Sequence, residues 1–538
     1  MFKKILPFLL ILTPMLSIAQ EKGLDEEINE KFMPVATWWE NTVLTPIHIA
    51  GNDIPFVLLL LVFGATMFTI YFGFPAVSKF RLAINTVRGK YDEIDHHGVE
   101  KSDVNIVDGD LVDTIADESK DGEVSHFQAL ATAVSGTVGL GNIAGVAVAI
   151  AVGGPGATFW MIVCGLIGMS SKFVECTLGV KYRDVGEDGT VYGGPMYYLK
   201  RGLESQNKAV LGKILAVIFA VLCVGASFGG GNAFQSNQAA VQIVSMLGLT
   251  GGASGFVIGL IMAILVGIVI IGGIKRIAKI TEKIVPLMAI IYVVASLIII
   301  FSNIKYLGDA FSLIFSGAFN PMAGLGGVLG VIIVGFQRAA FSNEAGAGSA
   351  AIAHSAVKTK YPASEGVVAL LEPFIDTVVI CTMTALVIIF FNMDVGAFDY
   401  GNSKNSAVML SETGQYIGGV DLTSMAFDSV LPGFSYILTI AIILFAFSTM
   451  ISWSYYGLQS WKYLFGRGKT ADIIYKIMFL IFVVVGASAT LDAVIKFSDA
   501  MILALVFPNM IGLVLLFPKV KEEMIRYTDA IKSLKARS

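Results

Sequence analysis

The sequence of 538 residues is poor in charged side chains. Only 14% of its residues are Asp, Glu, Lys or Arg and 55% are hydrophobic, whereas a soluble domain carries about 25% charged residues. Too few charges remain to cover a water-exposed surface, which excludes an ordinary soluble domain. The formal net charge of −4 also excludes the basic surface that nucleic-acid binding requires. The composition therefore indicates a protein that crosses a lipid bilayer several times.

Cysteines and clustered metal ligands are also scarce. The cysteines all lie in apolar segments, where a cysteine usually packs as a small hydrophobic side chain; they are Cys164, Cys176, Cys223 and Cys381. They suggest neither a disulfide framework nor a metal site. The apolar segments show no cluster of His, Cys, Asp and Glu of the kind that an enzyme needs. We therefore predict no catalytic residues and no cofactor.

The first residues have the pattern of a secretory signal peptide, predicted over 1–19. Lys3 and Lys4 precede an apolar run at 5–18, and small residues follow where a cleavage site would lie. An uncleaved first helix is the alternative, but the run is about fourteen residues long and contains two prolines, which is short for a membrane span. Removal of the peptide would place the new N-terminus and the segment 20–54 outside the cytoplasm.

Apolar segments recur along the rest of the chain. A membrane helix needs about twenty residues. We predict eleven such helices, near 55–75, 125–150, 155–180, 210–245, 254–273, 281–302, 323–356, 367–391, 433–456, 471–488 and 493–517. Because eleven is an odd number, an external N-terminus predicts a cytoplasmic C-terminus.

The distribution of Lys and Arg agrees with this topology. Cytoplasmic connections carry an excess of basic residues, and the loop 76–124 and the basic tail 518–538, both predicted to be cytoplasmic, are rich in them. The predicted external connections hold few basic residues, namely Lys22, Lys31, Lys305 and Lys404. The connection 392–432 is long, acidic and rich in glycine, and we predict that it is external.

Two of the apolar segments are interrupted by glycine. One contains S-G-T-V-G-L-G-N-I-A-G at 135–145 and the other F-S-N-E-A-G-A-G-S-A at 341–350. A broken membrane helix exposes backbone N–H and C=O groups, which is costly in lipid unless they line a cavity. Interrupted helices in corresponding halves of a membrane protein indicate a transporter's binding site. A small-residue packing face is the alternative interpretation of the first interruption.

The two breaks, predicted at 136–142 and 342–348, divide the chain into related halves. Without the leading helix, ten helices remain, five in 125–302 and five in 303–517, and each half opens with a broken helix. An odd number of helices per half forces the halves into opposite orientations, so they would be inverted repeats. The predicted fold is therefore an all-α polytopic membrane protein with a LeuT-type five-plus-five repeat after one extra helix.

Several blocks between residues 122 and 519 resemble a known family, the alanine or glycine:cation symporters, also called sodium:alanine symporters. The blocks are F-Q-A-L-A-T-A-V-S-G-T-V-G-L-G-N-I-A-G-V-A (127–147), G-G-P-G-A-T-F-W-M (153–161), Y-G-G-P-M-Y-Y-L (192–199), G-N-A-F-Q-S-N (231–237), R-A-A-F-S-N-E-A-G-A-G-S-A (338–350) and F-S-T-M-I-S-W-S-Y-Y-G (447–457). The resemblance implies a LeuT-type fold. It also implies sodium-coupled uptake of small neutral amino acids, mainly alanine and glycine, across a bacterial inner membrane by alternating access.

The first break offers a partner for the carboxylate of an amino acid. The free N–H groups around Gly139, Leu140 and Gly141 lie at a half-helix N-terminus, where the helix dipole favours an anion. We number the ten helices after the leading helix as core helices one to ten. With the resemblance, we extend the substrate site to further residues of both breaks and of the third and eighth core helices, namely Thr137, Gln235, Phe341, Ser342, Asn343, Thr449 and Trp453. Trp453 would close over a methyl-sized side chain; an interfacial aromatic anchor is the alternative.

Sodium is a hard cation that prefers oxygen ligands. The resemblance to the wider fold implies a sodium site between the first and eighth core helices, formed by the carbonyls of Ser135 and Val138 with Ser448 and Thr449. Both hydroxyl groups could instead bond to carbonyls of their own helix. A second, weaker sodium site is predicted near Thr137 and Asn142.

Charged residues in the spans leave alternatives open. Arg338 and Glu344 are expensive in a membrane and are expected to pair or to face water. We interpret them as a structural or gating ion pair; a cap on the half-helix that follows is a second role for Glu344. Glu372 and Asp376 are interpreted as structural.

A proton-coupled transporter of the same fold would need a titratable group at the sodium position, which the first and eighth helices lack. An ion channel is a more distant alternative.

Overall fold

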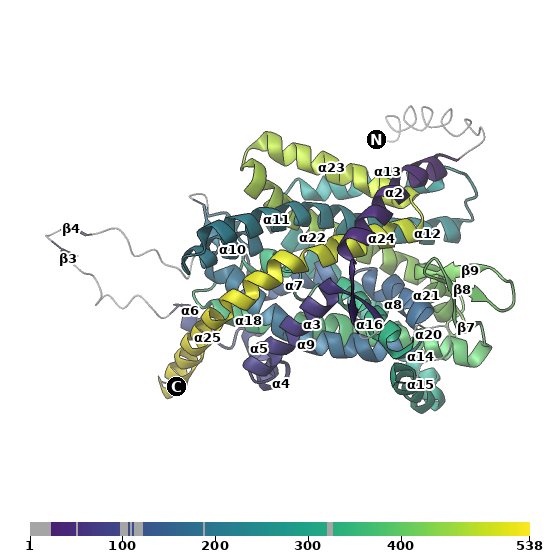
Figure 1. Cartoon of the computed structure of the whole chain (residues 1–538), viewed down its shortest axis with the longest axis horizontal. Coiled ribbons are helices and arrows are strands. Elements are labelled where there is room, and N and C mark those ends of the chain that lie inside the picture. Colours follow the sequence, from purple (N-terminus) through teal and green to yellow (C-terminus); the bar gives the residue numbers. More distant parts are fainter. Residues whose placement is uncertain are drawn as a thin grey trace.

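The computed structural model describes residues 23–49, 52–96, 106–107, 110–111, 122–186, 189–319 and 327–537. Within them the chain is mostly α-helical, with long helices such as α11 (Ala209–Phe228), α22 (Ser435–Phe465) and α25 (Val506–Arg537). In Figure 1 α11 lies close to the long axis of the molecule, and α25 runs obliquely to the C-terminus at the lower left. The predicted signal peptide, 1–19, and most of the acidic insert at 92–121 lie outside the described residues.

The segment before the predicted repeats contains helices and two short hairpins. Its elements are α2 (Leu24–Val43), β1 (Pro46–Ile49), β2 (Asn52–Pro55), α3 (Phe56–Tyr71), α4 (Pro75–Ser78), α5 (Phe80–Val87), α6 (Asp92–His96), β3 (Ile106–Val107) and β4 (Asp110–Leu111). β1 pairs with β2 and β3 pairs with β4, both antiparallel.

The predicted first half contains the helices of the five predicted spans that follow the leading helix. Its elements are α7 (His126–Thr137), η3 (Gly141–Gly145), α8 (Val146–Gly153), α9 (Gly156–Lys181), β5 (Asp184–Val185), β6 (Val191–Tyr192), α10 (Pro195–Glu204), α11, η4 (Gly229–Ala233), α12 (Phe234–Leu247), α13 (Ser254–Ile270) and α14 (Gly273–Ser302). Ser125 begins α7 with a capping box, since its side chain accepts from the Gln128 N–H and the Gln128 side chain accepts from the Ser125 N–H.

The predicted second half opens with η5 (Ile304–Tyr306) and α15 (Leu307–Phe319), which precede its broken helix, α16 (Gly327–Asn343) and α17 (Ala350–His354). Its further elements are α18 (Pro362–Ala369), α19 (Leu371–Pro373), η6 (Phe374–Cys381), α20 (Thr382–Val395), β7 (Phe398–Lys404), β8 (Ala407–Leu410), β9 (Tyr416–Gly418), α21 (Gly419–Asp428), α22, α23 (Lys469–Ser488), α24 (Leu491–Ala504) and α25.

Helices of membrane-spanning character lie at the predicted positions. Within the described residues, those long and apolar enough to cross a bilayer are Gly156–Lys181, Ala209–Leu247, Arg276–Ser302, Pro362–Val395, Ser435–Phe465, Lys469–Ser488 and Leu491–Ala536. An eighth span is the pair His126–Thr137 and Gly141–Gly153, bent by 50°. The remaining three predicted spans are apolar helices of 16 or 17 residues, α3, α13 and α16, near the lower limit for crossing. The count of eleven and the orientation of the termini stay predictions.

Both helix breaks occur where the glycines predicted them. The chain leaves the helix between α7 and η3, and again between α16 and α17. In the second break Glu344, Gly346 and Gly348 have φ angles of 55°, 87° and 87°. This left-handed region is accessible to glycine without strain but is unfavourable for most other residues, which explains the A-G-A-G sequence there.

Two π-helical segments were not predicted. η4 and η6 interrupt the third and seventh core helices, and π-helical turns commonly accompany functional sites. The G-G-G run in η4 also permits a close approach, because a Cβ atom on Gly231 would lie 2.1 Å from the ring of Trp453.

The packing of these helices brings the two breaks to the centre of the bundle. α7 packs against α14, α17 and α22, while η3 packs against α16 and η6. The connection 392–432 forms the antiparallel sheet β7–β8–β9 and the helix α21, which packs on η3 and α8. The Thr423 hydroxyl on α21 donates to the Ile143 carbonyl in the first break, at 3.1 Å.

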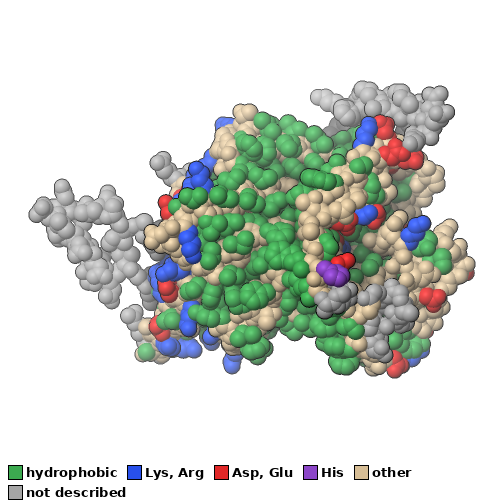
Figure 2. Space-filling view, viewed as in Figure 1, with side chains coloured by type: hydrophobic (Ala, Val, Ile, Leu, Met, Phe, Trp, Pro, Cys, Tyr) green, Lys and Arg blue, Asp and Glu red, His purple; other side chains and the backbone are tan. Residues whose placement is uncertain are grey.

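The surface separates charge from apolar residues. Figure 2 shows Lys and Arg side chains along the left edge, where α10 and the C-terminal part of α25 lie in Figure 1, and a mostly hydrophobic middle. A bundle embedded in lipid requires such an apolar middle surface.

Candidate functional site

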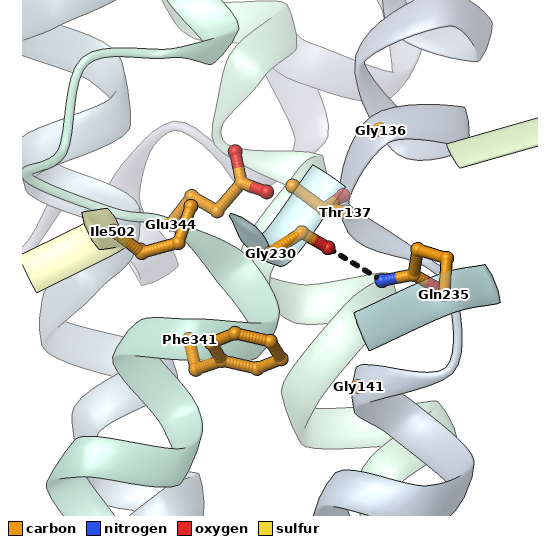
Figure 3. Close-up of a pocket in the computed structure, with 8 residues that line it drawn as sticks. All are labelled: Gly136, Thr137, Gly141, Gly230, Gln235, Phe341, Glu344 and Ile502. Carbon is orange, nitrogen blue, oxygen red and sulfur yellow. Dashed lines mark hydrogen bonds between the residues drawn. The ribbon is translucent and has the colours of Figure 1, made fainter. Parts of the chain in front are cut away.

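A small cavity lies between the two helix breaks. Residues from the first break, η4 and α12, the end of α16, and α24 line it (Figure 3): Gly136, Thr137, Gly141, Gly230, Gln235, Phe341, Glu344 and Ile502. Thr137, Gly141, Gln235 and Phe341 are predicted substrate residues. The cavity measures about 10 Å³, which is room for about one water molecule. An amino acid would therefore enter only if the surrounding side chains move.

The N–H groups of the first break point at amide oxygens. The Leu140 N–H donates to Gln235 Oε1 and the Gly139 N–H donates to Asn142 Oδ1, each at 2.9 Å. Gln235 is held in turn, because its Nε2 donates to the Gly230 carbonyl at 2.9 Å. The amide oxygen of Gln235 thus stands where the oxygen of a substrate carboxylate is predicted, and a carboxylate would have to displace it.

Oxygen atoms of the first and eighth core helices meet beside the break. The Thr449 hydroxyl donates to the Ser135 carbonyl at 3.0 Å, and the Ser135 hydroxyl donates to the Ser448 carbonyl at 2.9 Å. The Ser448 hydroxyl donates to the Phe445 carbonyl of its own helix. The alternative interpretation, which predicted such a bond for both residues, therefore matches Ser448, whereas Thr449 bonds to the first core helix. Val138 is fully buried at the end of α7. Hydroxyl and carbonyl oxygens are the donors that a hard cation prefers.

Asp376 joins the two breaks, although the sequence suggested only a structural role. The Asn142 Nδ2 donates to Asp376 Oδ1 at 2.6 Å, and the Ser342 hydroxyl donates to Oδ2 at 2.8 Å. Asn343 bonds to Thr377, which also donates to Asp376. Ser342 and Asn343 are therefore beside this carboxylate and are not among the cavity-lining residues. A carboxylate inside a span is itself a signal of function, and could have identified Asp376.

Glu344 and Trp453 form a pair at the cavity. The Trp453 Nε1 donates to Glu344 Oε1 at 2.9 Å, and the Ser349 hydroxyl bonds to Glu344 Oε2. Trp453 is buried behind Glu344 and is not among the cavity-lining residues. The expected pairing of Arg338 with Glu344 is wrong, because Arg338 forms its ion pair with Asp499 on α24. The sequence could not place α24 beside α16.

Sequence comparison decides the family. The model of the sodium:alanine symporter family matches residues 39–538. The chain belongs to this family. It is therefore a multi-pass transporter of the inner membrane and not an enzyme.

Individual relatives of this symporter are similar over most of their length. The sodium/alanine symporter AgcS of Methanococcus maripaludis is 42% identical over 78% of this chain and 87% of its own. The sodium/proton-dependent alanine carrier protein of Bacillus sp. PS3 is 32% identical over 77% of this chain and 90% of its own. Among solved structures, MhsT in complex with L-phenylalanine aligns with 74% of this chain and 99% of its own, with 16% identity and a TM-score of 0.48.

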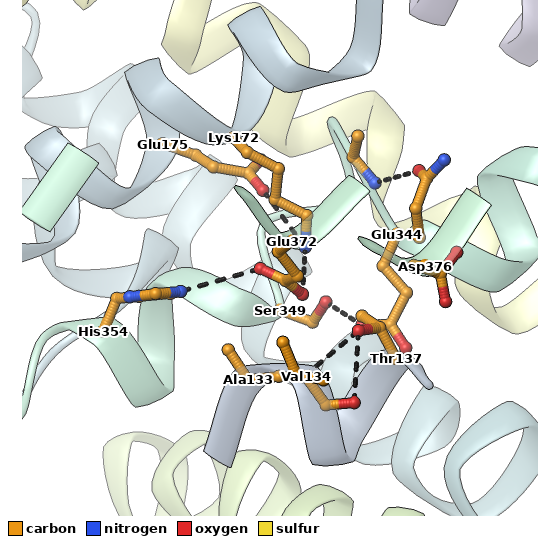
Figure 4. Close-up of polar contacts among 12 residues, drawn as sticks. Ala133, Val134, Thr137, Lys172, Glu175, Glu344, Ser349, His354, Glu372 and Asp376 are labelled. Carbon is orange, nitrogen blue, oxygen red and sulfur yellow. Dashed lines mark hydrogen bonds and ion pairs between the residues drawn. The ribbon is translucent and has the colours of Figure 1, made fainter. Parts of the chain in front are cut away.

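The symporter also contains a row of buried charged side chains that the sequence did not predict (Figure 4). Lys172 Nζ lies 3.0 Å from Glu372 Oε1 and 3.9 Å from Glu175 Oε1. His354 lies 3.6 Å from Glu372 Oε2 and 2.5 Å from Glu365 Oε1. His126 bonds to the other oxygen of Glu365. Five separate helices contribute these residues, so no local sequence pattern reveals the row.

This row has the composition of an ion-pair network. Within the described ranges, no group of three or more His, Cys, Asp or Glu side chains is arranged to hold a metal ion. Lys172, Glu175, Glu365 and Glu372 are fully buried, and a buried charge must be paired to be tolerated. The row therefore ties α9, α17, α18 and α19 to the start of α7.

Proposed function

We propose that this symporter couples inward sodium movement to the uptake of a small neutral amino acid, alanine or glycine, by alternating access in a LeuT-type fold of eleven spans. The observation that carries the proposal is the bond between the Thr449 hydroxyl and the Ser135 carbonyl, 3.0 Å long, beside a cavity lined by the first break. The names of the relatives, which include a sodium/alanine symporter, support the choice of ion and substrate.

Sodium and substrate would act on the same broken helix. A sodium ion ligated by the Ser135 and Val138 carbonyls and by Ser448 and Thr449 would hold the end of α7 against α22. The adjoining Gly139, Leu140 and Gly141 would then be ordered for a substrate carboxylate, which replaces Gln235 as acceptor. Asn142 would contribute to a second ion site beside Asp376. Because such coupling is reciprocal, each ligand would raise the affinity of the other.

Glu344 provides a negative charge at the cavity. It is one of the lining residues, and Figure 3 shows its carboxylate beside Thr137, where it would face the ammonium group of an amino acid. The ring of Phe341 lies at the same cavity, where it would contact the side chain. A cavity of about 10 Å³ admits no amino acid until its lining moves, so the choice of alanine and glycine rests on the family resemblance and on the names of the relatives.

The decisive experiment is uptake of labelled alanine into vesicles that contain the purified protein. An inward sodium gradient should drive accumulation, and replacement of sodium by choline should abolish it. Excess unlabelled glycine should compete, and phenylalanine should not. Uptake that is independent of sodium would contradict the coupling. Uptake driven instead by a proton gradient would favour the proton-coupled alternative, for which Glu344 is the titratable group at the cavity.

Thr449→Val is expected to raise the half-saturating sodium concentration about tenfold, because a hydrogen-bonding or ligating group at a charge contributes about 1.5–3 kcal/mol. The measurement is the sodium dependence of alanine uptake at saturating alanine. Ser454→Ala is the control, since the Ser454 hydroxyl is buried on the same helix but bonds only to the Ile451 carbonyl among the described contacts. An unchanged sodium dependence in Thr449→Val would remove this residue from the ion site.

A further inference from the structure

A basic pocket lies at the end of the bundle opposite the sheet β7–β8–β9 (Figure 1). It is formed by α10, the end of α22 and the loop after it, and its volume is about 280 Å³. Its lining residues are Asp184, Tyr197, Lys200, Arg201, Lys462, Tyr463, Gly466 and Arg467. Four of these side chains are cationic and one is anionic. The pocket lies among the loops that the distribution of basic residues assigns to the cytoplasm.

The arginines of this pocket are held in fixed positions. Asp184 accepts from the Nη2 atoms of Arg201 and Arg467, at 2.7 and 2.6 Å. The Arg467 guanidinium also lies over the ring of Tyr192, 3.6 Å from its centre. Partial burial opposes the ionisation of Asp184, but the bonds from Arg467 and Arg201 hold its pKa below the ordinary value. The carboxylate therefore keeps both guanidinium groups in place at neutral pH.

Lysines and tyrosines complete the pocket. Lys200 is exposed on α10, and Lys462 lies 3.7 Å from its nearest carboxylate, Asp472, too far for a good hydrogen bond. The rings of Tyr197 and Tyr463 meet edge to face at 5.5 Å and join α10 to α22. Preformed guanidinium groups with flanking ammonium groups match the oxygens and the charge of a phosphate.

Exposed apolar side chains lie on the elements around the pocket. Phe465, next to the lining residue Gly466, is 61% exposed. On α11, which packs against α10, Val210 is 75% and Ile214 is 52% exposed. A water-soluble phosphate ester would gain nothing from these side chains. A phospholipid would bury them beneath its acyl chains while its headgroup occupied the pocket.

We propose that this pocket binds the phosphate headgroup of an anionic phospholipid, with the acyl chains over Phe465 and the start of α11. Basic pockets between membrane helices at the cytoplasmic side suit anionic headgroups. The site depends on the membrane setting of the chain and not on the transported substrate or ion. Failure of sodium-driven alanine uptake would therefore leave this proposal untouched.

The test is a lipid titration of the detergent-purified full chain, followed by native mass spectrometry. Phosphatidylglycerol should bind at least tenfold more tightly than phosphatidylcholine. Because each basic residue near a lipid surface contributes about fivefold, the double variant Lys200→Gln/Lys462→Gln should lose at least tenfold in phosphatidylglycerol affinity. Arg467→Gln, tested alone, should also weaken binding, which keeps the test valid if one variant folds poorly.

The control variant removes the same charge from the same end of the bundle. Lys519→Gln/Lys532→Gln replaces two partly or fully exposed lysines that pair with neighbouring carboxylates, and it should retain phosphatidylglycerol binding. Equal loss in both double variants would mean general electrostatic attraction and overturn the site. Equal affinity for the two lipids would do the same. Binding of free glycerol 3-phosphate as tight as that of phosphatidylglycerol would assign the pocket to a soluble phosphate ester instead.

Discussion

Gly139→Ala is expected to reduce sodium-driven alanine uptake at least tenfold. A Cβ atom on Gly139 would lie 2.4 Å from Thr449 Oγ1 and 3.0 Å from Gln235 Oε1. Both atoms belong to the proposed ion and substrate sites, so the added methyl group separates the first break from the two helices that face it. An extra methyl group forced into a close contact destabilises the packed site by about 1–3 kcal/mol. Each 1.4 kcal/mol corresponds to a factor of ten in an equilibrium constant.

The matched control lies six residues further along the same broken helix. A Cβ atom on Gly145 would have no neighbouring atom within 4 Å, and Gly145 has helical backbone angles. Gly145→Ala should therefore transport alanine at close to the unmodified rate. Initial uptake rates, normalised to the amount of folded protein in the vesicles, provide the comparison. Equal activity of the two variants would contradict the placement of the site at Gly139.

The second large effect concerns stability. Lys172→Met is expected to lower the free energy of unfolding by about 3–5 kcal/mol, the usual cost of removing one partner from a buried ion pair. Lys172 is fully buried and its ammonium group lies between Glu372 and Glu175. When the ammonium group is removed, both carboxylates stay buried and lose the cation that Lys172 supplies. In detergent the melting temperature should fall by about 5 °C or more.

A double variant separates the lost charge from the lost side chain. Lys172→Met/Glu372→Gln removes both charges of the closest pair, and it should recover at least half of the loss in melting temperature. Lys532→Met is the surface control, because Lys532 pairs with Asp529 but both side chains are mostly exposed, and such pairs contribute about 0–1 kcal/mol. A small effect of Lys172→Met, or no recovery in the double variant, would exclude an energetic role for the pair.

The broken helices illustrate what local sequence can predict. The glycines between Ser135 and Gly145 interrupt an apolar run, and the helix does end at Thr137 and resume at Gly141. The second break lies between Asn343 and Ala350, close to the predicted range. Glycine and hydrophobic length act within a few residues along the chain, so these features can be predicted without knowledge of the packing.

The contacts of the candidate site depend on distant segments. Gln235 was predicted as a substrate residue with the help of the family resemblance, but its bond to the Leu140 N–H joins positions 95 apart in the sequence. Asp376 and Glu344 were interpreted as structural or capping residues, yet one receives bonds from both breaks and the other lines the cavity. For the same reason Arg338 was expected to pair with Glu344, whereas it pairs with Asp499. A charge does not specify its partner until the helices have packed.

The sequence by itself determined that this chain crosses a membrane many times, that two of its helices are broken, and which family it resembles. These properties follow from composition, from local backbone preferences and from contiguous blocks of residues. Only the tertiary structure decided which polar groups meet at the breaks, that Trp453 is buried behind Glu344, and that His126, Glu365 and His354 share one row. In a low-dielectric interior each such group must find a partner, and the packing of the helices selects it.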